Sequence, residues 1–137
     1  MHSWFSGNGR PVEYTEMIET IEEHHSADGT VYIGSDTQPH RGGCIMSSAI
    51  VLHGAYNQRG GKYFISREVI TSKTMVFLAT RILAEAERTI QIAQDVATLF
   101  PDVKMELHVD ISNTDKKTPT SNLASMIVGY VTGNGFD

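Results

Sequence analysis

Two aspartates in this chain each follow a run of apolar residues of strand length. Asp36 comes after the residues VYI in the segment TVYIGSDTQ, and Asp110 closes the alternating segment VKMELHVD. A strand end holds a carboxylate on a rigid element, while the loop beyond it can open towards a substrate. An isolated aspartate after a strand is more often a turn residue, so Asp36 indicates a site only if the rest of the chain supplies partners for it.

The second aspartate is the first such partner. If the two strands are parallel neighbours, Asp36 and Asp110 lie at the same edge of the sheet, about 5 Å apart. Two carboxylates this close repel each other unless a cation joins them. Mg²⁺ takes oxygen ligands, commonly one or two carboxylates together with waters and phosphate oxygens of a substrate. The pair therefore predicts a divalent cation site.

A third carboxylate is available in the helical segment ILAEAER, which contains Glu85 and Glu87. Residues two apart on a helix point about 200° away from each other, so only one of the two can lie over the strand ends. The alternative for both is a solvated helix face with pairing between neighbouring turns, such as Arg81 with Glu85.

The elements that must position these carboxylates are predicted from hydrophobic periodicity. In chain order we expect a helix at 11–25, strands at 31–33, 44–53 and 62–67, a helix at 72–99, a strand at 103–110, a short helix at 119–125 and a strand at 127–132. The segment PHRGG is expected to be a loop, and the strands at 44–53 and 62–67 an antiparallel hairpin. Because the strand at 103–110 directly follows a long helix, we expect it to lie parallel to the first strand.

Composition narrows the class of protein. The 137 residues, 40% hydrophobic and 20% charged, are typical of one globular domain. No run of about 18 apolar residues predicts a membrane span, and no signal peptide is evident at the N-terminus. The single cysteine, Cys44, cannot form an internal disulfide, and the expected location is the cytoplasm. The net charge of −5 argues against a broad basic surface for nucleic acid, but bound cations would offset an acidic site that acts on phosphodiesters.

The predicted order of elements resembles that of the ribonuclease H-like fold. The motifs YIGSDTQ, RILAE, LHVDI and GYVTGNGF are also similar to those of the YkuK family of predicted ribonuclease H-like proteins, over about residues 4–136. The resemblance implies an α/β fold in a single domain spanning residues 1–137. Its mixed five-stranded sheet would have a three-strand antiparallel meander, a long helix and then parallel strands, with flanking helices.

The resemblance also implies a function. It places the metal ligands and catalytic residues at Asp36, Glu85 and Asp110, with Glu87 as the second choice on the helix. These residues would hold Mg²⁺ or Mn²⁺ for hydrolysis of nucleic-acid phosphodiester bonds. The expected partner is a nucleic acid of undetermined type and not a membrane, and the oligomeric state is left open, a homodimer included.

Two alternatives and the roles of three histidines remain open. Ribonuclease H-like nucleases usually add a ligand from a helix after the fifth strand, and this chain stops at Asp137, where that helix would begin. A non-catalytic module that binds nucleic acid or protein is therefore the main alternative, and hydrolysis of a small phosphorylated metabolite would use the same metal chemistry. His108, two residues before Asp110, could serve as a proton carrier or as a structural residue. His24 and His25 are expected at a solvated helix end, with metal binding as the alternative.

Overall fold

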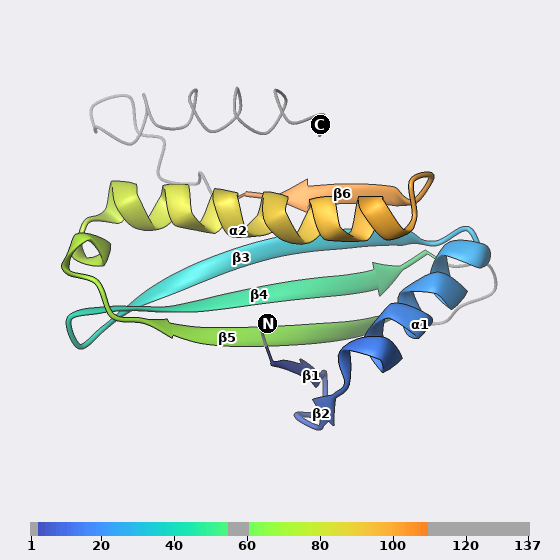
Figure 1. Cartoon of the computed structure of the whole chain (residues 1–137), viewed down its shortest axis with the longest axis horizontal. Helices are drawn as coiled ribbons and strands as arrows, with labels where there is room; N and C mark the ends of the chain where they lie inside the picture. The colour runs from blue at the N-terminus through green and yellow to red at the C-terminus, as the bar shows by residue number, and fades with distance from the viewer. Residues whose placement is uncertain (1–2, 55–60, 110–137) are drawn as a thin grey trace.

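The computed structural model describes residues 3–54 and 61–109, which form a six-stranded mixed sheet with helices packed against it (Figure 1). The strand order is β2-β1-β5-β4-β3-β6. The elements are β1 (Trp4–Ser6), β2 (Pro11–Val12), α1 (Tyr14–Ser26), β3 (Thr30–His40), β4 (Gly43–His53), β5 (Lys62–Ile70), the 3₁₀ turn η1 (Lys73–Val76), α2 (Leu78–Leu99) and β6 (Lys104–His108). This is the mixed α/β architecture expected, although the described sheet has six strands where five were predicted.

Strands β3, β4 and β5 form the predicted antiparallel meander, but β3 is longer than expected. It pairs with β4 at every position from Thr30↔His53 to His40↔Gly43, so the prediction that the strand ends after residue 33 is wrong. The loop expected at PHRGG is also wrong, because only Arg41 and Gly42 turn the chain, with Gly42 at φ 70°. Asp36 therefore lies within a strand and not at its end.

Strand β6 lies parallel to β3, as predicted. Their pairing runs from Thr30↔Lys104 to Gly34↔His108. Asp36 and Asp110 each come two residues after this last pair in the sequence. Asp110 lies outside the described residues, as do the helix expected at 119–125 and the strand expected at 127–132.

Both helices begin later than predicted. Pro11 and Val12 pair with Phe5 and Trp4 as β2, which the hydrophobic pattern did not indicate, so α1 begins only at Tyr14. The turn η1 takes up the first residues of the long helical pattern, and α2 begins at Leu78. With 22 residues, α2 is about 33 Å long and still crosses the sheet.

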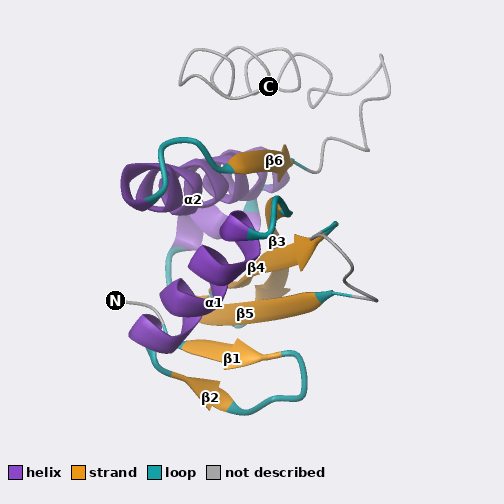
Figure 2. Cartoon of the chain, turned by 90° about the vertical axis from the view of Figure 1, so that its right-hand side faces the viewer, coloured by secondary structure: helices purple, strands orange, loops and turns teal. Residues whose placement is uncertain are grey.

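The helices α1 and α2 lie on one face of the sheet, as two views of the chain agree (Figures 1 and 2). Alternate residues of the central strands point to this face and form the core with the inner sides of the helices. The most buried members include Met17, Ile21, Val31, Ile33, Ile50, Leu52, Ile92, Ala93 and Val96. Among the described residues, no helix combines the length and the apolar character that a membrane crossing requires.

The end of α1 is attached to the sheet by His24. Its side chain is buried, and Nε2 lies 3.0 Å from the carbonyl oxygen of Thr30 and 3.1 Å from that of His53. Carbonyl oxygens only accept hydrogen bonds, so Nε2 must carry the proton and donate to both. The expectation that His24 is solvated is wrong, because the C-terminal end of α1 lies against the ends of β3 and β4.

The turn after α1 requires Gly29 because of this histidine. A Cβ atom at Gly29 would lie 2.2 Å from Nε2 of His24, while the left-handed position of the turn is occupied by Asp28, at φ 62°. We expect Gly29→Ala to lower the free energy of unfolding by about 1–3 kcal/mol in urea denaturation, since the added methyl group overpacks a buried site. In a His24→Ala background the same substitution should cost less. Equal costs in both backgrounds would contradict this account.

Candidate metal centre

Helix α2 carries one carboxylate into the interface with the sheet. Glu85 lies on the inner side of the helix with Ile82 and Ala86, and only 5% of its surface is exposed. Its Oε2 atom accepts hydrogen bonds from the backbone N–H of Thr37, at 2.8 Å, and from the Thr37 hydroxyl, at 2.6 Å. A buried carboxylate needs such donors, and bonds to an ionised acceptor are short.

Of the two glutamates weighed for the helix position, the structure brings Glu85 to the sheet and leaves Glu87 exposed. The difference follows from the helical rotation between residues two apart. The neighbouring guanidinium of Arg81 donates to the carbonyl oxygens of Met75 and Val76, at 2.9 and 3.1 Å, and so holds the turn η1 against the start of α2.

The bond to Thr37 places the Glu85 carboxylate at the edge of β3. The last pair between β3 and β6 is Gly34↔His108, and Thr37 comes three residues later, where the described part of β6 has ended. Backbone N–H groups point sideways from a strand, towards the position of a neighbouring strand. Glu85 thus accepts an edge N–H that lies past the last pair with β6.

Asp36 directly precedes the residue that holds Glu85. The Thr37 nitrogen is one peptide bond from Asp36, so Oε2 of Glu85 lies no more than about 6 Å from the Asp36 Cα atom. The Asp36 side chain is exposed and leaves β3 on the face opposite α1 and α2, because Ser35 and Thr37 on either side of it point to the face that carries these helices. The two carboxylates therefore approach the same short stretch of β3 from opposite faces.

The third predicted ligand, Asp110, follows β6 in the sequence and lies outside the described residues. Within residues 3–54 and 61–109, no group of three His, Cys, Asp or Glu side chains is close enough to hold a metal ion. Asp36 and Glu85 nevertheless supply carboxylate oxygens, which Mg²⁺ and Mn²⁺ prefer. The donor chemistry at this edge of β3 fits a hard divalent cation.

On the face opposite α1 and α2, Asp36 borders a shallow hollow of about 340 Å³. Its floor is formed by Gly34 of β3 and Ala49 of β4, which pair with each other. The surface is hollowed there because glycine has no side chain and alanine has a small one. His108 lies at the β6 side of the hollow, with its ring 5.6 Å from that of Tyr32. His108 and Asp36 therefore share one open surface.

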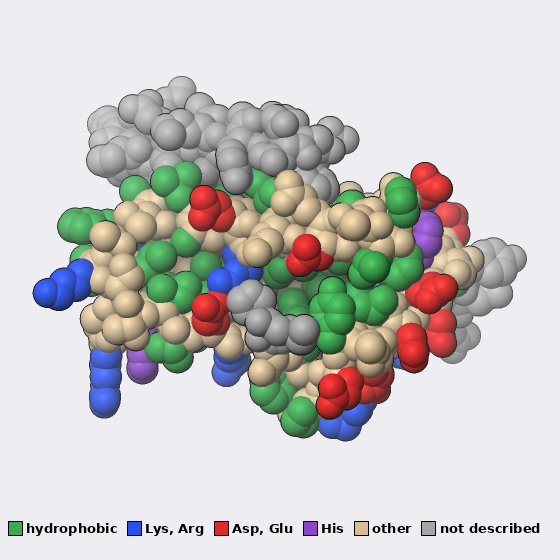
Figure 3. Space-filling model, viewed as in Figure 1, with side chains coloured by type: hydrophobic (Ala, Val, Ile, Leu, Met, Phe, Trp, Pro, Cys, Tyr) green, Lys and Arg blue, Asp and Glu red, His purple; other side chains and the backbone are tan. Residues whose placement is uncertain are grey.

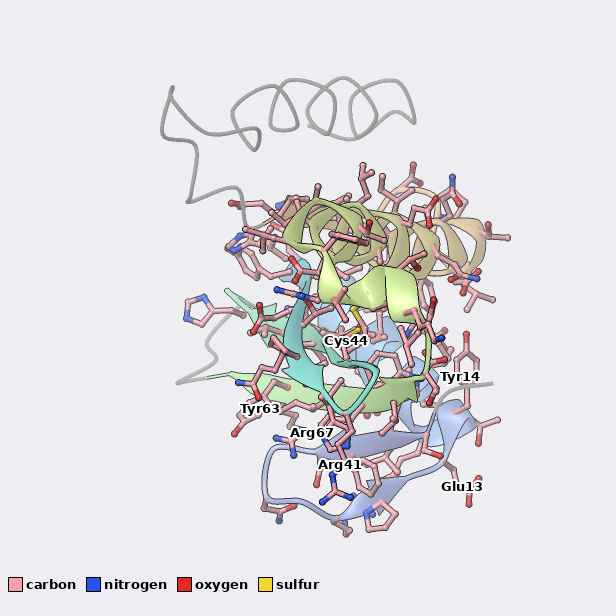
Figure 4. All side chains as sticks on the ribbon, turned by 90° about the vertical axis from the view of Figure 1, so that its left-hand side faces the viewer. Glu13, Tyr14, Arg41, Cys44, Tyr63 and Arg67 are labelled. Carbon is pink, nitrogen blue, oxygen red and sulfur yellow. The ribbon has the colours of Figure 1, made fainter. Side chains whose placement is uncertain are left out.

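The same face carries further side chains that could contact a substrate. Tyr63 and Arg67 on β5 point away from the helices, whereas Cys44 lies between the sheet and the helical layer (Figure 4). Burial raises the pKa of the Cys44 thiol, with the nearby Arg81 opposing the shift. A buried thiol of this kind is a poor nucleophile, so Cys44 is a core residue and not a reactive one.

Thr37 is the residue of this site that sequence reasoning missed. Its type carries no obvious chemistry, and it sits beside the more conspicuous Asp36. The signal was the alternation of β3, since Thr37 shares a strand face with the apolar Val31 and Ile33 and so must face the helices. The alternation could be followed as far as Thr37 only because the structure shows that β3 extends to His40.

A second hollow, of about 580 Å³, lies between α1 and α2, where hydrophobic side chains gather (Figure 3). Its lining includes Trp4, Tyr14, Met17 and Asp95. Burial and, to a smaller extent, the carboxylate of Asp95 raise the pKa of Tyr14. Neither Asp36 nor Glu85 lines this second hollow, so the hollow is separate from the candidate metal centre.

The fold and the site together define a class of protein. An antiparallel meander, a long helix that brings a glutamate onto the first strand of the meander, and a parallel strand returning beside it are the features of an α/β protein of the ribonuclease H type. The family model described as "Ribonuclease H-like" matches residues 13–137, and the chain belongs to this family. No curated protein and no solved structure matched the chain.

Proposed function

We propose that this protein is a divalent-metal-dependent hydrolase of nucleic-acid phosphodiester bonds. Asp36, Glu85 and Asp110 would hold Mg²⁺ or Mn²⁺ in this proposal. The observation that carries it is the Glu85 carboxylate, which is held at the edge of β3 one residue from Asp36, past the last pair between β3 and β6. Membership of the ribonuclease H-like family supports the same class of reaction.

The different surroundings of Glu85 and Asp36 suit them to different roles in the proposed site. Glu85 is buried and fixed by two hydrogen bonds, which suits a ligand that sets the position of a cation. Asp36 is exposed on the open face, where a substrate phosphate could reach the same cation. A bound divalent cation would neutralise phosphate charge and make a water more acidic. His108, on the same open surface, would act as the proton carrier.

A non-catalytic module is the second candidate, and one observation favours it. The Asp36 side chain leaves β3 on the face opposite α2, whereas the Glu85 carboxylate reaches β3 from the α2 side. In that case the open sheet face, with Tyr63, Arg67 and His108, would contact nucleic acid without cleaving it. Such a protein would bind oligonucleotides equally well with and without Mn²⁺.

Removal of the metal separates the two candidates. We expect cleavage of single-stranded, double-stranded or hybrid oligonucleotides in Mn²⁺ or Mg²⁺, complete loss of cleavage in EDTA, and recovery when excess metal is restored, because the carboxylates need a cation to bind phosphate. Gel analysis of labelled oligonucleotides measures all three states. Small phosphorylated metabolites belong in the same screen, since they would use the same chemistry. Cleavage that survives EDTA would contradict the proposal.

Two finer assignments are also proposals. The similarity of YIGSDTQ, RILAE and LHVDI to YkuK proteins supports membership of that subfamily within the ribonuclease H-like family. A nuclease with one buried, unpaired cysteine would suit the reducing cytoplasm, which is the location we propose.

A further inference from the structure

We propose that Thr37 is a positioning residue of the candidate metal centre, and that its hydroxyl and backbone N–H fix the Glu85 carboxylate relative to Asp36. The inference rests on the proposed function, since it assigns Thr37 a role in the same metal site. It goes beyond the predicted ligands, because Thr37 itself contributes no carboxylate.

Thr37 holds the Glu85 carboxylate by two hydrogen bonds, which together we call the clamp. Both donors of Thr37 bond to a single oxygen, Oε2 of Glu85, at 2.8 and 2.6 Å. The N–H belongs to the backbone of β3, which is held in register by the pairing Thr37↔Met46 with β4. The hydroxyl approaches from the helix side of the strand. Two donors in different directions leave the oxygen much less freedom than one would.

The peptide between Asp36 and Thr37 joins the two proposed ligands. The Asp36 side chain leaves β3 on the open face, and the next N–H in the chain holds Glu85 at the strand edge. The spacing between the Glu85 carboxylate and the Asp36 Cα atom is thus set by one rigid peptide unit and the clamp. A shift of α2 along the sheet would change this spacing only by breaking both bonds to Thr37.

The rival explanation is that Thr37 only stabilises the contact between α2 and β3. Other polar groups in this interface have that character, such as the bond of 2.9 Å between the Ser35 and Ser48 hydroxyls. A purely structural Thr37 would affect thermal stability without a specific effect on metal affinity. The test must therefore measure metal binding apart from folding.

Thr37→Val removes the hydroxyl while keeping the branched shape and the backbone N–H. We expect it to weaken Mn²⁺ binding in calorimetry by about 10–100-fold, which is typical for loss of a group that orients a metal ligand. In cleavage assays kcat should fall while KM for the oligonucleotide stays nearly constant, because Thr37 faces away from the open surface. Thr37→Ser keeps the hydroxyl and should recover most of the affinity.

Thr98→Val is the matched control. Thr98 is exposed near the end of α2, and its hydroxyl donates only to the Gln94 carbonyl oxygen among the described contacts. This variant should bind Mn²⁺ like the original protein. Thermal melting of all variants in EDTA then shows whether any loss of affinity merely follows a loss of folded protein.

A measurement on the unsubstituted protein avoids the risk that Thr37→Val does not fold. In ¹⁵N–¹H NMR spectra, titration with Mg²⁺ should shift the backbone amide signal of Thr37, since the carboxylate that accepts its proton would also bind the cation. If Mg²⁺ shifts the Asp36 signal and leaves that of Thr37 unchanged, Thr37 does not position a ligand.

Comparison with Asp36→Asn distinguishes failure of this inference from failure of the proposed function. If Asp36→Asn abolishes Mn²⁺ binding and Thr37→Val leaves it unchanged, the metal site stands and the role of Thr37 is overturned. If the unsubstituted protein binds no Mn²⁺ at millimolar concentration, the metal site and the role of Thr37 both fall.

Discussion

Asp36→Asn is expected to abolish Mn²⁺ binding and to reduce oligonucleotide cleavage to the background rate. The substitution keeps the size of the side chain and removes its negative charge, and a neutral amide oxygen is a much weaker ligand for a hard cation. Because Asp36 is exposed, the free energy of unfolding should change by less than about 0.5 kcal/mol. Calorimetry with Mn²⁺, cleavage assays and urea denaturation measure the three quantities.

The matched control is Asp102→Asn, which removes another exposed aspartate from the turn before β6. It lowers the negative charge by the same amount but lies outside the candidate site, so metal affinity and cleavage should persist. If the loss of Asp36 acted only by lowering the total negative charge, Asp102→Asn would reduce Mn²⁺ binding and cleavage as much as Asp36→Asn does. Normal Mn²⁺ titration and normal cleavage in the Asp36→Asn protein would exclude Asp36 as a ligand.

Glu85→Ala is expected to have the largest effect on stability and, like Asp36→Asn, to abolish Mn²⁺ binding. It leaves the N–H and the hydroxyl of Thr37 without their acceptor in the interface between α2 and β3, at a cost of about 1–3 kcal/mol for each group. We therefore expect the free energy of unfolding to fall by about 2–5 kcal/mol and Mn²⁺ binding to disappear. Urea denaturation in EDTA and calorimetry at low temperature measure the two effects separately.

Two further variants separate the structural part of this effect from the metal part. Glu85→Gln keeps an oxygen that can accept from Thr37 but loses the charge, so it should retain much of the stability and little of the Mn²⁺ affinity. Glu87→Ala, two residues along the same helix, removes an exposed glutamate and should change the stability by less than about 0.5 kcal/mol. If Glu87→Ala lost Mn²⁺ binding and the Glu85 variants kept it, the metal ligand on α2 would be Glu87 and not Glu85.

The two possible functions differ in what these variants would show. In a metal-dependent nuclease, Asp36→Asn and Glu85→Gln lose the same activity although their side chains lie on opposite faces of β3. In a non-catalytic module, Glu85→Gln would have only a small effect on stability, and Asp36→Asn would alter only contacts on the open face. Agreement between the two variants in Mn²⁺ calorimetry is thus the sharpest support for a shared site.

Much of the framework was determined by the sequence alone. The alternation of apolar and polar residues in 103–110 predicted β6, and its place directly after a long helix predicted that it lies parallel to β3. The meander followed from apolar strands joined by short polar connections. These features were readable because strand and helix periodicity depend on neighbouring residues, and because a crossover helix constrains the direction of the strand that follows it.

Only the tertiary structure decided the extent of β3 and the contacts of its far half. Residues 34–40 lack an apolar pattern, yet pairing with β4 makes them a strand, and this moves Asp36 from a strand end into its middle. The burial of His24 and the bonds between Thr37 and Glu85 likewise join residues far apart in the chain. Local sequence specifies which face a side chain takes within an element, but only the packed sheet and helices determine which groups meet across them.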